Sequence, residues 1–180
     1  MNAELVNVVA GGNLGVTVDL HKLSSQISQY SVNYEPEVSP GLHFELPQSG
    51  VTVMIFASGK YHLTGGEGID QIHEAYDEVI DIIGEYVNEN INKEDPDIRN
   101  LVYRGDFERE FDLSELATSL EDADYDPKKQ PGLRCRLNNQ SGLITIFRTG
   151  RFTIVGVKNK KEGNRLLHEL EAKITELVSN

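Results

Sequence analysis

Short runs of apolar and polar residues, separated by glycine and proline, fill much of the chain and predict β-strands. Ser58-Gly59 lies between two of these runs and predicts a hairpin turn. In the first half, the predicted strands are Leu5–Ala10, Leu42–Leu46, Val51–Phe56 and Tyr61–Thr64. In the second half, they are Asp97–Tyr103, Leu133–Leu137, Leu143–Phe147 and Phe152–Val155.

Helical spacing appears twice in each half. Asp19 and Asp112 are suited to cap short helices that begin at Leu20 and Leu113. Longer apolar stripes at intervals of three and four residues predict helices over 69–87 and near the end of the chain, from Leu166. We predict the order β-α-β-β-β-β-α for each half, which has one strand more than the four whose ranges are given above. Because each helix has one apolar stripe, all four should cover one face of an antiparallel sheet and leave the other face free.

The sequence itself is duplicated in the same order. Asn7 recurs as Asn100 with an offset of 93 residues, and Tyr34 recurs as Tyr125 with an offset of 91. The two copies thus differ by a gap of two residues. We expect a pseudo-twofold α+β protein with a first repeat at 1–90 and a second at 91–180. The other recurring residues include Leu20, Pro36, Pro40, Gly41, Leu42, Ile55, Phe56, Gly59 and Gly65.

Strand alternation predicts which side chains occupy the free face of the sheet. They are mostly Asn, Val, Thr and Phe, with few carboxylates, and a large apolar surface of this kind tends to mark an interaction site. The predicted free-face residues are Asn7, Val9, Thr52, Met54, Phe56, Lys60, His62, Thr64, Asn100, Val102, Thr145, Phe147, Arg151, Thr153 and Val155.

Composition narrows the class of protein. The 180 residues contain one cysteine, Cys135, so an internal disulfide and a cysteine-based zinc site are not expected. No apolar run approaches the roughly 20 residues of a membrane span, and the amino terminus lacks signal-peptide character. We expect a cytoplasmic, nucleoid-associated protein with no membrane contact.

The net charge of −12 is unevenly distributed. Residues 1–90 hold two basic and thirteen acidic side chains, whereas residues 91–180 hold fifteen basic and sixteen acidic ones. Either the first half has a solvated acidic face, or the two halves meet different partners.

Signals for enzyme chemistry are weak. The segment 11–15, Gly-Gly-Asn-Leu-Gly, lacks the spacing of a phosphate-binding loop and predicts a turn. Cys135 lies beside Arg134 and Arg136, but a buried structural thiol is the favoured interpretation. We expect no enzyme activity, no cofactor and no metal.

The motifs taken together resemble the TATA-box-binding proteins of archaea. They are Val6-Asn7-Val8-Val9-Ala10, Asn13-Leu14-Gly15, Asp19-Leu20, Tyr34-x-Pro36, Pro40-Gly41-Leu42, Ile55-Phe56-x-Ser58-Gly59-Lys60 and Thr64-Gly65, with their second copies. The resemblance implies a saddle of ten antiparallel strands with four helices on its convex side.

The resemblance also implies that the free face binds the minor groove of A·T-rich promoter DNA. Asn7 and Asn100 match a central pair, Phe56 and Phe147 match wedges, and the family kinks the duplex by about 80°, a known family property. The implied DNA-contacting residues are Asn7, Val9, Phe56, Ser58, Lys60, Thr64, Asn100, Val102, Arg136, Phe147, Thr149 and Arg151.

The chain departs from the family pattern at several of these places. Ser39 and Gln130 stand where each repeat usually has a second Phe, so half of the wedges are missing. Glu45 replaces a common Arg, whereas the second copy keeps Arg136. His62 stands where Val is expected.

A further departure affects protein partners. In the family, an acidic and apolar loop of the second repeat meets transcription factor B, but here the loop contains Asp126, Lys128 and Lys129. Docking of factor B and RNA polymerase is implied by the resemblance and put in question by these lysines. Two hypotheses stay open: a promoter-binding initiation factor, and a divergent regulator that acts through protein or other nucleic-acid partners.

Overall fold

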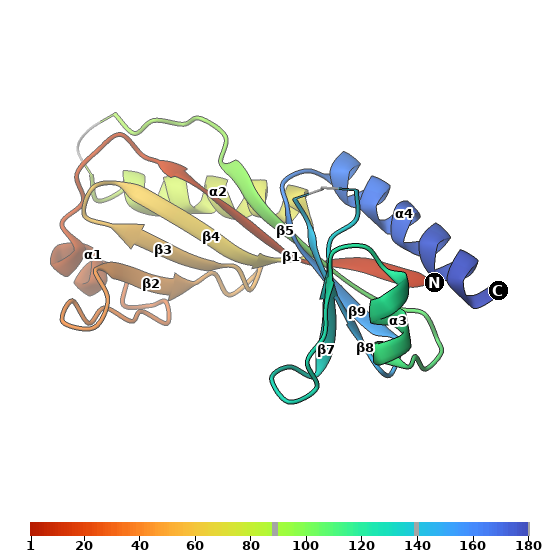
Figure 1. Cartoon of the computed structure of the whole chain (residues 1–180). Helices are drawn as coiled ribbons and strands as arrows, with labels where there is room; N and C mark the ends of the chain where they lie inside the picture. Colours follow the sequence, from red (N-terminus) through yellow and green to blue (C-terminus); the bar gives the residue numbers. More distant parts are fainter. Residues whose placement is uncertain (88–89, 139–140, 180) are drawn as a thin grey trace. The chain divides into compact units, whose positions relative to one another are not determined.

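The computed structural model describes residues 1–87, 90–138 and 141–179. They form two compact units. We call Asn7–Arg99 the N unit, and Met1–Val6 with Asn100–Asn180 the C unit. The division falls within two long strands, β1 (Asn2–Asn13) and β5 (Asp97–Asp106), which Figure 1 shows in red and green. The proposed repeats 1–90 and 91–180 describe the duplication of the sequence and stay a prediction.

The sheet of the N unit has the strand order β2-β3-β4-β1, with antiparallel neighbours. Its further elements are α1 (Leu20–Gln26), β2 (Gly41–Glu45), β3 (Thr52–Phe56), β4 (Lys60–Gly66) and α2 (Ile69–Gly84). The strand expected between α1 and β2 is reduced to one bridge between Asn33 and His43.

The C unit contains the full predicted series β-α-β-β-β-β-α. Its strand order is β5-β9-β8-β7-β6. The elements after β5 are α3 (Leu113–Ser119), β6 (Ala123–Asp124), β7 (Gly132–Cys135), β8 (Leu143–Phe147), β9 (Arg151–Val157) and α4 (Lys160–Ser179). The predicted α+β class is therefore confirmed, with nine strands in place of ten among the described residues.

The short helices begin where the sequence predicts. The Asp19 carboxylate accepts a hydrogen bond from Lys22 N, and the Asp112 carboxylate accepts from Ser114 N and Glu115 N. Each carboxylate thereby satisfies backbone donors that a first helical turn leaves free.

The prediction of a turn at 11–15 is wrong for its first three residues. Gly11, Gly12 and Asn13 continue β1, where they pair with His62, Tyr61 and Lys60 of β4. Glycine is needed there because of a close approach between strands: a Cβ atom at Gly11 would lie 2.6 Å from the carbonyl oxygen of Tyr61. The glycines thus serve strand packing rather than chain reversal.

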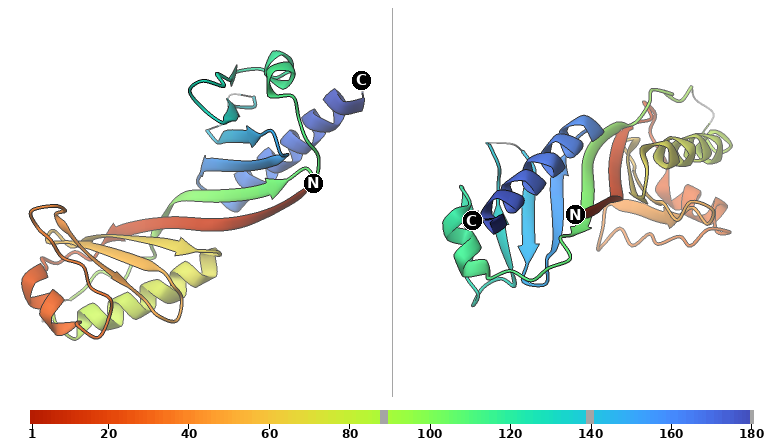
Figure 2. Two further views of the ribbon diagram at one scale, coloured as in Figure 1. Left: turned by 90° about the horizontal axis from the view of Figure 1, so that it is seen from below. Right: turned by 90° about the vertical axis from the view of Figure 1, so that its right-hand side faces the viewer.

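The core of each unit lies between the sheet and its long helix. In the N unit, Ile55 and Leu63 of the sheet and Ile72 and Val79 of α2 are fully buried. In the C unit, α4 runs along one face of the sheet in both views of Figure 2, and its Leu166 is fully buried. Among the described residues, the opposite face of each sheet is not covered by its long helix, and this face holds the candidate site.

Candidate nucleic-acid interface

The strand alternation predicted from the sequence is confirmed in both units. In β3, Val53 and Ile55 are buried, whereas the intervening Thr52, Met54 and Phe56 are half-buried and lie on the free face. The same alternation places these predicted residues on the free faces: Asn7, Val9, Lys60, His62, Thr64, Asn100, Val102, Thr145, Phe147, Arg151, Thr153 and Val155.

Asn7 and Asn100 are held by the same contact in their own units. Asn7 Oδ1 accepts a hydrogen bond of 2.8 Å from Gly65 N, and Asn100 Oδ1 accepts one of 2.7 Å from Gly156 N. Both glycines have positive φ angles, +107° and +90°, which side-chain-bearing residues rarely adopt. In the N unit the contact also gathers Thr64, whose hydroxyl is 3.5 Å from Asn7 Oδ1.

This contact fixes the orientation of each side-chain amide. A backbone N–H can only donate, so the atom that faces it must be the carbonyl oxygen of the asparagine. The NH2 group is therefore on the other side of the amide. In the part of the chain that the structure describes, neither NH2 group has a hydrogen-bond partner, so each offers donors to a ligand.

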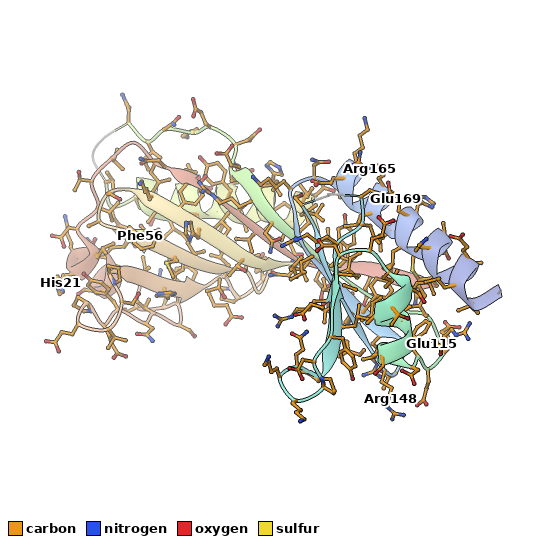
Figure 3. The ribbon with its side chains drawn as sticks, in the orientation of Figure 1. His21, Phe56, Glu115, Arg148, Arg165 and Glu169 are labelled. Carbon is orange, nitrogen blue, oxygen red and sulfur yellow. The ribbon has the colours of Figure 1, made fainter. Side chains whose placement is uncertain are left out.

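Phe56 and Phe147 each lie against a glycine of the neighbouring strand. Phe56 is paired with Gly41, and Phe147 with Gly132. A Cβ atom at Gly41 would lie 3.3 Å from Phe56 Cε1, and one at Gly132 would lie 3.1 Å from Phe147 Cε1. The absence of a side chain at both glycines gives each ring a flat support. Figure 3 labels Phe56 on the sheet of the N unit.

The polar and basic residues among the implied DNA contacts differ from one another in their surroundings. Ser58 and Thr149 are exposed in the turns before Lys60 and Arg151, which are exposed at the starts of β4 and β9. Arg151 pairs with Asp106 at 3.8 Å. Arg136 donates to the carbonyl of Ser141 at 3.1 Å, which holds that guanidinium near the backbone.

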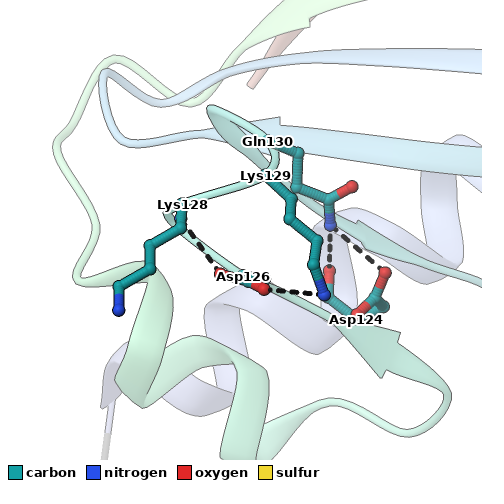
Figure 4. Close-up of polar contacts among 5 residues, drawn as sticks. All are labelled: Asp124, Asp126, Lys128, Lys129 and Gln130. Atoms are coloured by element: carbon teal, nitrogen blue, oxygen red, sulfur yellow. Dashed lines mark hydrogen bonds and ion pairs between the residues drawn. The ribbon is translucent and has the colours of Figure 1, made fainter.

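The two positions that lack a Phe are held by local hydrogen bonds. Ser39 Oγ lies 3.4 Å from His43 Nε2. Gln130 Nε2 donates to the carbonyl of Asp124 at 3.0 Å, as Figure 4 shows. Neither side chain presents an apolar surface.

The loop of the C unit with the two lysines is organised around Asp126. One carboxylate oxygen accepts from Lys128 N at 3.0 Å, and the other lies 3.0 Å from Lys129 Nζ. Figure 4 shows that the side chain of Lys128 extends away from these contacts. Lys128 is therefore the lysine of this loop whose ammonium group is not drawn toward Asp126.

The environment of Cys135 does not activate its thiol. Burial raises the pKa of the Cys135 thiol to about 12, and the nearby charge of Asp122 acts in the same direction. The thiol thus stays protonated and is a poor nucleophile.

Among the described residues, no group of three His, Cys, Asp or Glu side chains is arranged to hold a metal ion. No helix in the described ranges combines the length and apolar character that crossing a membrane requires.

Sequence reasoning missed the supports of this face. It identified Gly41, Gly65 and their second copies as recurring motif residues, but not as the residues that support the Phe rings and fix the Asn amides. Their recurrence in both copies was the available signal. Arg99, which belongs to the sequence range of the second repeat, lies in the N unit, and the sequence gives no signal for this placement.

Comparison with known proteins agrees with this geometry. The family model described as "Transcription factor TFIID (or TATA-binding protein, TBP)" matches residues 2–86 and 95–177. This chain belongs to the TATA-binding protein family. The resemblance and the archaeal character predicted from the sequence are confirmed.

Several archaeal family members match along nearly their whole length. The TATA-box-binding protein of Thermococcus sibiricus is 30% identical, over 92% of this chain and 90% of that protein. TATA-box-binding protein B of Halobacterium salinarum is 31% identical, over 95% and 92%. The solved structure of the Methanococcus jannaschii TBP has a TM-score of 0.83 and 28% identity, and the match covers 98% of this chain and 99% of that one. The fold is therefore that of the family.

Proposed function

We propose that the chain is a transcription initiation factor that binds the minor groove of A·T-rich promoter DNA through the free faces of its two units. The observation that carries the proposal is the orientation of Asn7 and Asn100, whose NH2 groups are left as donors. Membership of the TATA-binding protein family supports the same function.

Donor groups at these positions favour A·T pairs for a chemical reason. The minor-groove edges of A·T and T·A present only acceptors, adenine N3 and thymine O2. A G·C pair adds the guanine amino group, which is itself a donor. An Asn NH2 group facing that amino group would lose its partner, and an unpaired buried donor costs about 1–3 kcal/mol. The preference for A·T over G·C pairs therefore depends on the hydrogen bonds from Gly65 N to Asn7 and from Gly156 N to Asn100, because they leave the NH2 groups free to donate.

Phe56 and Phe147 supply the apolar surface for deforming the duplex. Each is half-buried and supported by a glycine, so a ring can enter a base step without first being moved off the sheet. Opening a step costs on the order of a few kcal/mol. Because Ser39 and Gln130 supply no second ring, we expect a shallower kink than in family members with two Phe residues in each repeat.

We expect the basic side chains of this protein to bind DNA phosphates weakly. The net charge is −12, and of the three basic residues among the implied DNA contacts, Arg151 is already paired with Asp106. Each phosphate that a protein neutralises adds about 0.9 to the slope of log affinity against log salt. A modest salt slope is therefore expected for this chain.

A second function is favoured by Ser39, Gln130 and the loop at Asp126. A divergent regulator would use the free faces for protein or another nucleic acid rather than for kinked DNA. In either case, the partner at the loop should present acidic groups to Lys128. Transcription factor B and RNA polymerase are the proposed protein partners if factor B has such a surface.

A fluorescence anisotropy titration with A·T-rich and G·C-rich duplexes, over a range of salt, tests the first function. We expect the A·T-rich duplex to bind more tightly, and Phe56→Ala and Phe147→Ala to weaken binding at least about tenfold each. Lys22→Gln, on α1 and away from the free face, is the control. Equal affinity for both duplexes, or full binding by both Phe variants, would favour the second function.

A further inference from the structure

Arg99 lies across the free face of the N unit. A Cβ atom at Gly11 would lie 3.1 Å from Arg99 Nε and 3.0 Å from His62 Cδ2. The guanidinium and the imidazole therefore meet above Gly11, in space that any larger residue at this position would fill. Gly11 and His62 are paired across β1 and β4, two residues before this pairing ends at Asn13 and Lys60.

His62 connects Arg99 to the wedge of the same unit. The ring centroids of His62 and Phe56 lie 5.7 Å apart, with an interplanar angle of 74°. Arg99 and His62 are exposed, and Phe56 is half-buried. His62 thus lies between the space above Gly11, where Arg99 ends, and the ring of Phe56.

The C unit has no equivalent available cation at the corresponding place. There, Arg104 is paired with Thr153 across β5 and β9, and its guanidinium makes a 2.8 Å salt bridge with Glu4. In the described part of the N unit, by contrast, Arg99 has no carboxylate within salt-bridge distance. The guanidinium of Arg99 is thus available in the N unit, whereas that of Arg104 in the C unit is neutralised by Glu4.

Carboxylates do lie near Arg99, in a pocket of about 450 Å³ that Lys60, His62 and Arg99 help to line. Two of the three are engaged elsewhere. Asp95 lies 3.8 Å from His73 Nδ1, and Glu94 accepts from Asn92 at 3.2 Å. The third is Asp97. These groups reduce the positive potential but leave the guanidinium of Arg99 free to contact a ligand.

We propose that Arg99, positioned by His62 over Gly11, is a DNA contact of the N unit that reaches the minor groove beside the Phe56 wedge. The inference rests on the proposed DNA-binding function. A narrow A·T-rich minor groove has an enhanced negative potential that attracts arginine, and adenine N3 and thymine O2 accept from a guanidinium. Arg99 would supply a cation to the unit in which Glu45 stands where the second copy has Arg136.

The test is a DNA titration of Arg99→Gln, Arg99→Lys and His62→Thr at several salt concentrations, with Lys22→Gln as the charge-matched control. His62→Thr copies the residue that the C unit has at Thr153. We expect Arg99→Gln to weaken A·T-rich binding about tenfold and to lower the salt slope by about 0.9. Arg99→Lys should keep the salt slope and recover part of the affinity, and His62→Thr should weaken binding about threefold.

Wild-type affinity and an unchanged salt slope for Arg99→Gln would overturn the inference, as would an equal loss in Lys22→Gln. The proposed function is tested separately by Phe56→Ala and by the comparison of A·T-rich with G·C-rich duplexes. If those results support DNA binding while Arg99→Gln binds normally, only the role of Arg99 is wrong. If the wild-type chain binds no duplex, both proposals are wrong.

Discussion

Replacing Asn7 or Asn100 by Asp changes one group in each amide and little else. Asp has nearly the same shape as Asn and keeps an oxygen that accepts from Gly65 N or Gly156 N. The outward NH2 group becomes a carboxylate oxygen, which cannot donate to adenine N3 or thymine O2. The substitution therefore separates the structural contact from the proposed DNA contact.

The substitution should change the free energy of DNA binding more than the free energy of unfolding. A bonded pair between a side chain and a base edge contributes about 1–3 kcal/mol to discrimination, and the new oxygen faces acceptors that repel it. We expect each single variant to lose about 2 kcal/mol of binding free energy, or about thirtyfold in affinity. The free energy of unfolding should change by less than about 1 kcal/mol, because the hydrogen bond to the glycine N–H is kept.

Anisotropy titrations with an A·T-rich duplex and thermal unfolding by circular dichroism measure both quantities. Asn159→Asp is a matched control because Asn159 Oδ1 also accepts from a backbone N–H, that of Glu162, at the start of α4. It adds the same charge just before α4, the helix that runs along one face of the sheet, opposite the free face. Undiminished binding by Asn7→Asp and Asn100→Asp, or an equal loss in Asn159→Asp, would refute the reasoning about the amides.

Four other substitutions or treatments have defined outcomes. Glu4→Gln should release Arg104 from its 2.8 Å salt bridge and raise DNA affinity severalfold; unchanged affinity would mean that Arg104 does not reach DNA. Gly59→Ala should lower the free energy of unfolding by at least about 2 kcal/mol, because φ is +79° and the added Cβ would clash with the carbonyl oxygen of Val16; unchanged stability in thermal unfolding would contradict this. A thiol reagent at pH 8 should label Cys135 in denaturant but not in the native protein, and fast labelling of the native protein would contradict this. The free energy of unfolding should fall as pH rises from 9 toward 12, because in this range the thiol ionises readily only in the unfolded chain. Gln130→Phe should increase the DNA bend measured by energy transfer between duplex ends, and no change would argue against a wedge at that position.

The sequence was sufficient to predict most of the free face. Period-two alternation identified Phe56 and Phe147 as outward residues, because a strand that covers a core must bury every second side chain. The caps at Asp19 and Asp112 followed from local chemistry, since the carboxylate meets backbone donors within three residues. Features that depend on residues close together in the sequence could therefore be predicted from it.

Features governed by contacts between distant strands were not. The hydrogen bond from Gly65 N to Asn7 joins residues 58 apart, and the sequence does not reveal a positive φ angle at Gly65. Gly11 was predicted as part of a turn because its requirement for glycine comes from β4 rather than from its own segment. Only the structure shows that Arg99, within the range 91–180, lies in the N unit.

The most direct test of the account uses duplexes in which single atoms of the minor groove are changed. Inosine·C pairs present the minor-groove edge of A·T, and 2,6-diaminopurine·T pairs present that of G·C, whereas their major-groove edges follow the opposite assignment. If the NH2 groups of Asn7 and Asn100 read minor-groove acceptors, the chain should bind the inosine duplex nearly as well as A·T and should reject the diaminopurine duplex. Tight binding to diaminopurine·T with loss of binding to inosine·C would contradict the central claim.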